Sequence, residues 1–225
     1  MTQFTFRSAF FQFIYTAIAL ASLLSPKVGW GQCPTIQAIM VDACSTIPTE
    51  EGLNEFIIIN SGGGFNTNTL YLDFDNNNNN FGQQNNDINF NNGNDPVNPT
   101  PCGLQPGNPS LISGCNAIPI GPGFNVPPNS TVILQTSNGA NTAYDFSNIC
   151  SPGQCVYVIQ NACTRTAGGF TNSGAGTRIT IIGLTTPACS NAYIYDRAQL
   201  VGGDGAYFIP FSTYGNGGCA APPVT

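Results

Sequence analysis

Short runs of β-branched and aromatic residues, separated by turn-forming residues, recur along this chain of 225 residues. Such runs are typical of β-strands, whereas long amphipathic helices need many Ala, Leu, Glu and Lys residues, and only 7 % of this chain is charged. We expect strands at Ile36–Asp42, Asn54–Asn60, Thr69–Phe74, Thr131–Thr136, Cys155–Gln160, Arg178–Leu184, Ala192–Val201 and Ala206–Phe211. The pattern predicts an all-β fold, a two-sheet sandwich.

Two stretches depart from the usual alternation of apolar and polar residues. Phe56–Ile59 is apolar throughout, so we expect this run at the centre of a sheet, with one face in the core and the other covered by a loop. The stretch from about 75 to 124 is rich first in Asn and then in Pro and Gly. Because such a tract buries too little apolar surface to offset its ordering entropy, we expect a mobile, low-complexity inserted loop.

The N-terminus has the pattern of a signal peptide. Arg7 supplies a positive charge, and Ser8–Leu24 is an apolar stretch interrupted only by Gln12 and small hydroxyl residues. The small residues Gly29 and Gly31 suit cleavage before Gln32. We therefore expect residues 1–31 to be the signal and residues 32–225 to be one secreted or cell-surface domain, with no membrane span after cleavage. One alternative is an uncleaved anchor, for which the apolar stretch is a little short. Another is a lipoprotein at Cys33, but Gln32 stands where a small residue is needed.

The charge balance excludes several functions. Removing Arg7 and Lys27 with the signal leaves three arginines against eleven acidic residues, a net charge of −8, with no lysine and no histidine. Nucleic-acid binding requires clustered Lys and Arg, so nucleic acid is excluded as a partner. Ser-His-Asp, Cys-His and Ser-Lys catalysis are excluded as well, because the required bases are missing.

All nine cysteines lie in the expected mature part, and in an exported chain this usage predicts disulfides. Cys102–Cys115 and Cys150–Cys155 are close enough in sequence to form local bridges, and Cys33–Cys219 would tie the ends together. The connectivity does not follow from the sequence, and the odd count leaves one thiol free or paired with another chain. The nine are Cys33, Cys44, Cys102, Cys115, Cys150, Cys155, Cys163, Cys189 and Cys219.

Oxygen-bearing side chains at alternate positions make a candidate calcium site that begins at the end of the third expected strand. A strict EF-hand loop would carry Gly at its sixth position and an acid at its twelfth, where this chain has Asn78 and Gln84. The alternative is a solvated linker that begins with two acids. The candidate ligands are Asp73, Asp75, Asn77 and Asn79.

Two further groups could bind or convert a sugar. Tyr193 and Tyr195 share one strand face and would form a stacking platform if they were exposed; the alternative is that they pack in the core. Paired carboxylates can hydrolyse glycosides, and the dense acidic cluster consists of Asp42, Glu50, Glu51 and Glu55. We expect Glu50 and Glu51 to be solvated in a turn, and Glu55 to accept backbone hydrogen bonds.

Several segments resemble the lamin-tail-type domain of secreted Bacteroidota proteins. Ile36–Asp42 is similar to the family's opening strand, Glu51–Asn60 to its second strand, Thr69–Phe74 to a following apolar strand, and Val126–Leu134 to its turn into a mid-domain strand. The resemblance implies an immunoglobulin-like sandwich with a surface, adhesive or scaffolding role and no catalytic residues. Members often continue into a C-terminal sorting domain, so we expect either a continuation past Thr225 or a different export route.

These observations favour a non-catalytic, secreted or cell-surface module that binds or scaffolds an extracellular protein or a surface polysaccharide. One alternative is a carbohydrate-active accessory domain or glycosidase that uses the acidic cluster. A second is a structural subunit of an extracellular matrix or filament, suggested by the odd cysteine and the low charge.

Overall fold

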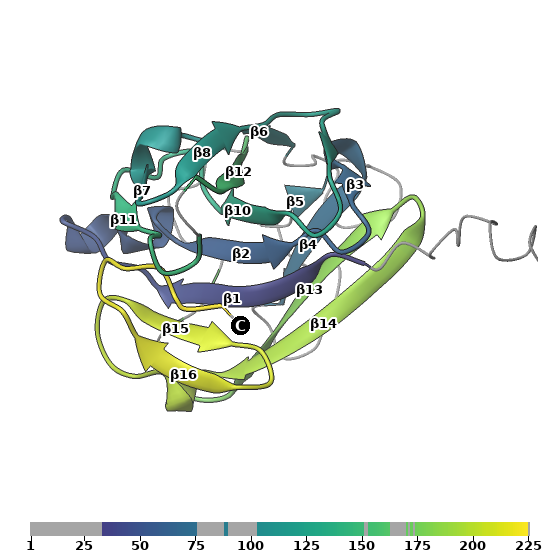
Figure 1. Cartoon of the computed structure of the whole chain (residues 1–225). Coiled ribbons are helices and arrows are strands. Elements are labelled where there is room, and N and C mark those ends of the chain that lie inside the picture. The colour runs from purple at the N-terminus through teal and green to yellow at the C-terminus, as the bar shows by residue number, and fades with distance from the viewer. Residues whose placement is uncertain are drawn as a thin grey trace, which may run out of the picture. The chain divides into compact units, whose positions relative to one another are not determined.

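A large mixed sheet forms the body of the protein. The computed structural model describes residues 33–75, 88–89, 103–150, 153–162, 170, 172 and 174–224. In this part the large sheet runs in the order β16-β15-β1-β2-β10-β12-β6, with β8 also paired to β12 (Figure 1). Its strands are β1 (Thr35–Asp42), β2 (Phe56–Asn60), β6 (Leu104–Pro106), β8 (Asn116–Pro119), β10 (Thr131–Gln135), β12 (Cys155–Asn161), β15 (Ala206–Ile209) and β16 (Thr213–Asn216). The pairings β10–β12 and β12–β8 are parallel, and the others are antiparallel.

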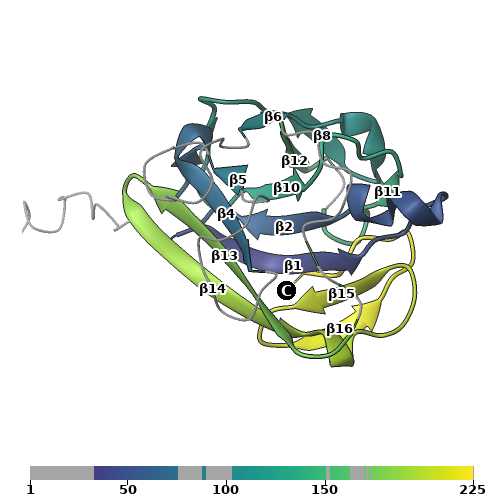
Figure 2. The ribbon, with the colours of Figure 1, turned by 180° about the vertical axis from the view of Figure 1, so that it is seen from behind.

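A second, antiparallel sheet lies across one face of the large one, in the order β14-β13-β4-β5 (Figures 1 and 2). Its strands are β4 (Leu70–Asp75), β5 (Ile88–Asn89), β13 (Thr177–Thr185) and β14 (Ala188–Asp196). Two small pairs complete the strands: β3 (Phe65–Asn66) with β9 (Asn125–Val126), and β7 (Ile112–Ser113) with β11 (Tyr144–Asp145). The short 3-10 helices are η1 (Pro48–Leu53), η2 (Thr67–Thr69), η3 (Pro109–Leu111) and η4 (Arg197–Gln199).

The two sheets enclose the first hydrophobic core. Ile57 and Ile59 of β2 point into it, together with Leu72 of β4 and Ile182 of β13. Opposite sheet faces that bury alternate side chains against each other define a sandwich, so the predicted all-β sandwich is confirmed. The immunoglobulin-like strand arrangement remains a prediction.

The other face of the large sheet is also buried. Phe56 and Ile58 of β2 point into a second core, where Phe56 packs against Tyr144 and Phe146 at ring-centroid distances of 4.9 and 5.0 Å. The small pair β7–β11 and the turn after β11 cover this face. The expectation for Phe56–Ile59, a central strand covered on both sides, is therefore confirmed.

Most expected strands form, and the differences have local causes. The strand expected over Ala192–Val201 ends at Asp196, because its carboxylate accepts the Ala198 N–H at 3.0 Å and starts the 3-10 turn η4. A continuous loop was expected to include residues 103–124, but these residues contain β6, η3, β7 and β8. They are ordered because Leu104, Ile112 and Ile120 are buried. Residues 76–87 and 90–102 of the expected insertion, and the expected signal peptide, lie outside the described residues.

Among the described residues, three disulfides join positions that are distant in the sequence: Cys33–Cys189, Cys44–Cys219 and Cys115–Cys150. The bridges suggested by spacing, Cys102–Cys115, Cys150–Cys155 and Cys33–Cys219, are therefore wrong. Cys115 meets Cys150 because β7 and β11 lie side by side just before these two cysteines. Among the described cysteines, Cys155 is free and exposed. No helix in the described ranges is long and apolar enough to cross a membrane.

Replacing Cys44 and Cys219 together by serine should lower the free energy of unfolding by about 2–5 kcal/mol, because this bridge restricts the unfolded chain over a long loop. The matched control is Cys155→Ser, which removes a free thiol and should change stability by less than about 0.5 kcal/mol. Denaturant titration of the oxidised proteins measures both. Equal stability of the double variant and the wild type would contradict the importance of this bridge.

Candidate functional site

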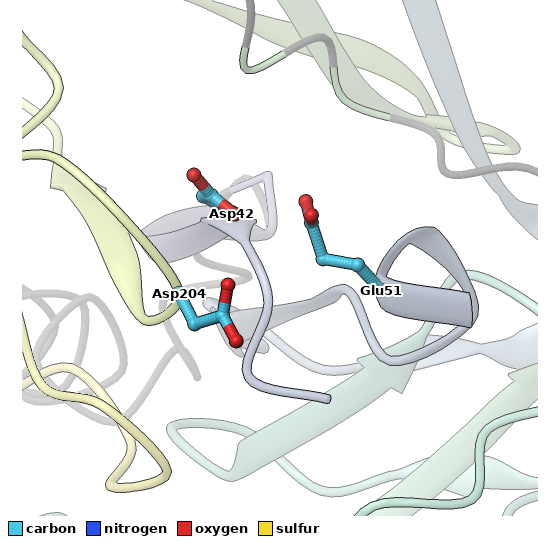
Figure 3. A group of neighbouring side chains, drawn as sticks. All are labelled: Asp42, Glu51 and Asp204. Atoms are coloured by element: carbon cyan, nitrogen blue, oxygen red, sulfur yellow. The ribbon is translucent and has the colours of Figure 1, made fainter. Parts of the chain in front are cut away.

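Three carboxylates from distant parts of the chain meet at the end of β1. Asp42 is the last residue of β1, Glu51 lies in η1, and Asp204 lies in the loop between η4 and β15. One oxygen from each lies within 4.8 Å of the others. Figure 3 shows the three side chains, which we call the carboxylate cluster.

The loop that carries Asp204 is held in place by hydrogen bonds. The Gly205 N–H donates to the Asp42 carbonyl at 2.6 Å, and this bond places Asp204 beside Asp42. Gly205 has φ +96°, a conformation that glycine adopts without strain. The side-chain amide of Asn216 fixes the rest of the loop, donating at 3.1–3.2 Å to the carbonyls of Val201, Gly202 and Gly203.

The position of Glu51 depends on the buried residue that follows its helix. Pro48 stands in the first turn of η1, where its missing N–H costs nothing. At the other end, the Asn54 N–H donates to the Glu51 carbonyl at 2.9 Å. The Asn54 side chain accepts the N–H groups of Asn141 and Thr142 at 2.8 and 2.9 Å, and so anchors the helix to the loop after β10.

Burial and like charge act together on Glu51. Partial burial raises its pKa most, followed by the hydrogen bond with Asp42 and by the charges of Asp42 and Asp204; together they raise the pKa to about 7. At neutral pH the Glu51 carboxyl is therefore protonated in a large fraction of molecules and can donate its proton to Asp42. A second hydrogen bond comes from the Asn172 side-chain amide to Glu51 Oε1.

This arrangement can hold a proton or bind a hard cation. Oxygen ligands stand about 2.3–2.6 Å from Ca²⁺, so two ligands on opposite sides of one ion are about 5 Å apart. The oxygens of the carboxylate cluster lie within that range. Asp42 and Glu51 are partly buried and Asp204 is exposed, so the cluster is open to solvent on one side.

The structure separates the acidic residues singled out in the sequence. Asp42 and Glu51 come together, whereas the Glu50 carboxylate accepts a hydrogen bond from the Asn141 side chain at 2.6 Å. Both Glu50 and Glu51 are partly buried, so the expectation of a fully solvated turn is wrong. Glu55 is 2 % exposed and its Oε2 accepts the Phe170 N–H at 2.8 Å, which confirms its expected role as a backbone acceptor.

Sequence reasoning missed Asp204 as a member of the carboxylate cluster. Its local sequence, Gly202–Gly205, is a turn-forming run and indicates only a loop. Asp204 is separated from Glu51 by 153 positions. Their proximity follows from the pairing of β15 with β1, which no local pattern reveals.

The calcium ligands proposed at the end of β4 and beyond it are only partly described. Asp73 and Asp75 lie in β4 opposite Ile181 and Ile179 of β13. Asp73 is partly buried on the outer face of the small sheet. Asn77 and Asn79 lie outside the described residues, so this calcium site remains a prediction.

Tyr193 and Tyr195 do not form an exposed stacking platform. They are 5 % and 1 % exposed and belong to the first core, where Tyr195 packs against Phe170 and Phe208. The Tyr193 hydroxyl accepts the Ile36 N–H at 3.1 Å. Both rings pack in the core, which was the alternative expectation. A sugar therefore cannot reach them.

Comparisons of the chain with protein-family models, with curated proteins and with solved structures found no significant match.

The carboxylate cluster should make stability depend on pH. The ordinary pKa of Glu51 is 4.5 and its folded value is about 7. Between these values the folded chain binds more protons than the unfolded chain, so the free energy of unfolding should fall as pH rises from about 4.5 to 7. Glu51→Gln should flatten this slope and stabilise the protein at pH 8 by about 1 kcal/mol, allowing for solvent screening at a partly exposed site.

The matched control for this prediction is Glu50→Gln, a change in the same helix that leaves the carboxylate cluster intact. Denaturant titrations at several pH values between 4 and 8 measure the slope for the wild type and for both variants. A slope that survives in Glu51→Gln would contradict the assignment.

Proposed function

We propose that this protein is exported and acts as a non-catalytic binding or scaffolding module, with an extracellular protein or a surface polysaccharide as its partner. The observation that carries the proposal is the presence of disulfides in the described part of the chain, which fasten Cys33, Cys44 and Cys115 to distant positions. Disulfides of this kind persist in oxidising compartments and are rare in the cytosol. They are compatible with an extracellular protein.

Composition supports a role in binding more than one in catalysis. The chain has no histidine, and its one lysine, Lys27, lies within the expected signal peptide. The mature chain therefore has none of the bases that most often activate Ser, Cys or Thr nucleophiles. The resemblance to lamin-tail-type domains also implies adhesive or scaffolding roles.

Rigidity supports the same proposal. The large sheet is buried on both faces, and the bridge Cys33–Cys189 connects the start of β1 to β14 of the other sheet. A frame of this kind presents its surfaces without a large ordering cost on binding, and rigid scaffolds bind partners more tightly for that reason.

The proposal is tested by producing the full-length chain with its own N-terminus in a secreting bacterial host. We expect the protein outside the cytoplasm, with a mature N-terminus near Gln32 and oxidised cysteines, as measured by fractionation, N-terminal sequencing and mass spectrometry. We also expect saturable binding to cell-surface polysaccharide or protein without turnover. Retention in the cytoplasm with reduced thiols, or failure to bind cells, glycans and proteins, would contradict it.

The same assays distinguish the carbohydrate-active alternative. Retaining glycosidases place two carboxyl groups about 5–5.5 Å apart and raise the pKa of the acid. Glu51 and Asp42 are the residues that such an enzyme would use. Glycan turnover that Glu51→Gln abolishes and Glu50→Gln preserves would support the enzyme in place of the binding module.

A further inference from the structure

The outer face of the small sheet carries an aromatic ring in an unusual setting. In β4 and β13, Leu70, Leu72, Ile182 and Leu184 point into the core between the sheets. Side chains alternate along a strand, so Tyr71, Asp73, Ile181 and Gly183 belong to the opposite, outer face. Figure 2 shows β4, β13 and β14 side by side.

Tyr71 lies over a glycine on the neighbouring strand. It is the register partner of Gly183, and a Cβ built on Gly183 would stand 2.5 Å from both Cζ and Oη of Tyr71. The hydroxyl end of the ring therefore occupies the space that a side chain at position 183 would fill. Aromatic residues cover strand glycines in this way and shield the exposed backbone.

This contact sets the orientation of the ring. Gly183 is buried, whereas Tyr71 itself is only partly buried. The hydroxyl end of the ring is fixed against position 183, and the residue keeps part of its surface exposed to solvent. The ring is held in this position before any ligand arrives, which lowers the entropy cost of binding.

The surroundings of Tyr71 combine apolar and polar groups. Gly183 of β13 pairs with Tyr71 of β4 on one side and with Ser190 of β14 on the other, and Ser190 is exposed. In the next row of the same face, Asp73 and Ala192 flank Ile181. A flat apolar centre with a few polar groups at its margin suits the face of a sugar ring, whose C–H groups pack on an aromatic ring while its hydroxyls hydrogen-bond at the edge.

Charge decides which sugars fit this surface. The expected mature chain has a net charge of −8 and only three arginines. Acidic polysaccharides would be repelled, since their recognition depends on clustered Arg and Lys. A neutral glycan has no such requirement.

We propose that Tyr71, held over Gly183 on the outer face of the small sheet, is a stacking platform for a neutral sugar ring. This inference rests on the proposed binding function and names its ligand class. It places sugar recognition on a different sheet face from the buried Tyr193 and Tyr195.

The test is affinity electrophoresis of the full-length, oxidised protein in native gels that contain a neutral glucan, a mannan or a galactomannan, with polygalacturonate as the acidic probe. We expect retardation by at least one neutral polymer and none by polygalacturonate. Tyr71→Ala should weaken the retarding interaction about tenfold through loss of the ring face. Tyr71→Phe should retain it within about twofold, since the ring remains.

The matched control is Tyr207→Ala. Tyr207 lies over Gly215 in the large sheet in the same way, with Cζ and Oη 2.5 and 2.4 Å from the position of a Cβ on Gly215, but it packs against the second core. Its replacement should leave glycan binding unchanged. If Tyr71→Ala does not fold, Tyr71→Leu makes the same comparison, because it keeps an apolar cover on Gly183 but has no ring.

The outcomes separate this inference from the proposed function. Unchanged glycan retardation of a folded Tyr71→Ala or Tyr71→Leu variant would overturn the Tyr71 platform and leave the binding function standing. Binding to proteins alone, or retardation by polygalacturonate alone, would overturn it as well. A wild-type protein that binds neither glycans nor proteins nor cells would overturn both.

Discussion

The burial of the large sheet on both of its faces is the constraint on which the rest of the structure depends. Ile57 and Ile59 enter one core and Phe56 and Ile58 the other, so β2 has no solvated side. A strand of this kind needs a covering layer on each face. The small sheet supplies one layer, and the segment around Tyr144 and Phe146 supplies the other.

The same organisation brings the carboxylate cluster together. β1 lies between β2 and β15, so its last residue stands next to the helix before β2 and to the loop before β15. Asp42 therefore meets Glu51 from one neighbour and Asp204 from the other. The resulting repulsion is tolerated because Glu51 accepts a proton more readily than an ordinary glutamate. The carboxylate cluster is a consequence of strand order.

The sequence predicted those parts of the fold whose signal is local. The run Phe56–Ile59 indicates a central strand because its four apolar side chains are consecutive. Features that depend on the meeting of distant segments were not predictable. The pairing of Cys115 with Cys150 and the approach of Asp204 to Glu51 both follow from strand pairing. The spacing of Tyr193 and Tyr195 places both side chains on the same face of a strand, but it does not indicate whether that face is buried or exposed.

The bridge Cys44–Cys219 also determines how the domain would respond to pulling. A force applied between Cys33 and Cys219 travels along β1 to Cys44 and then crosses the disulfide, so the rest of the sandwich is enclosed in a covalent loop. The covalent path contains only the residues from 33 to 44, which extend to about 40 Å at most. An oxidised domain would therefore act as a short, nearly inextensible link under tension, and a reduced one as a long elastic tether.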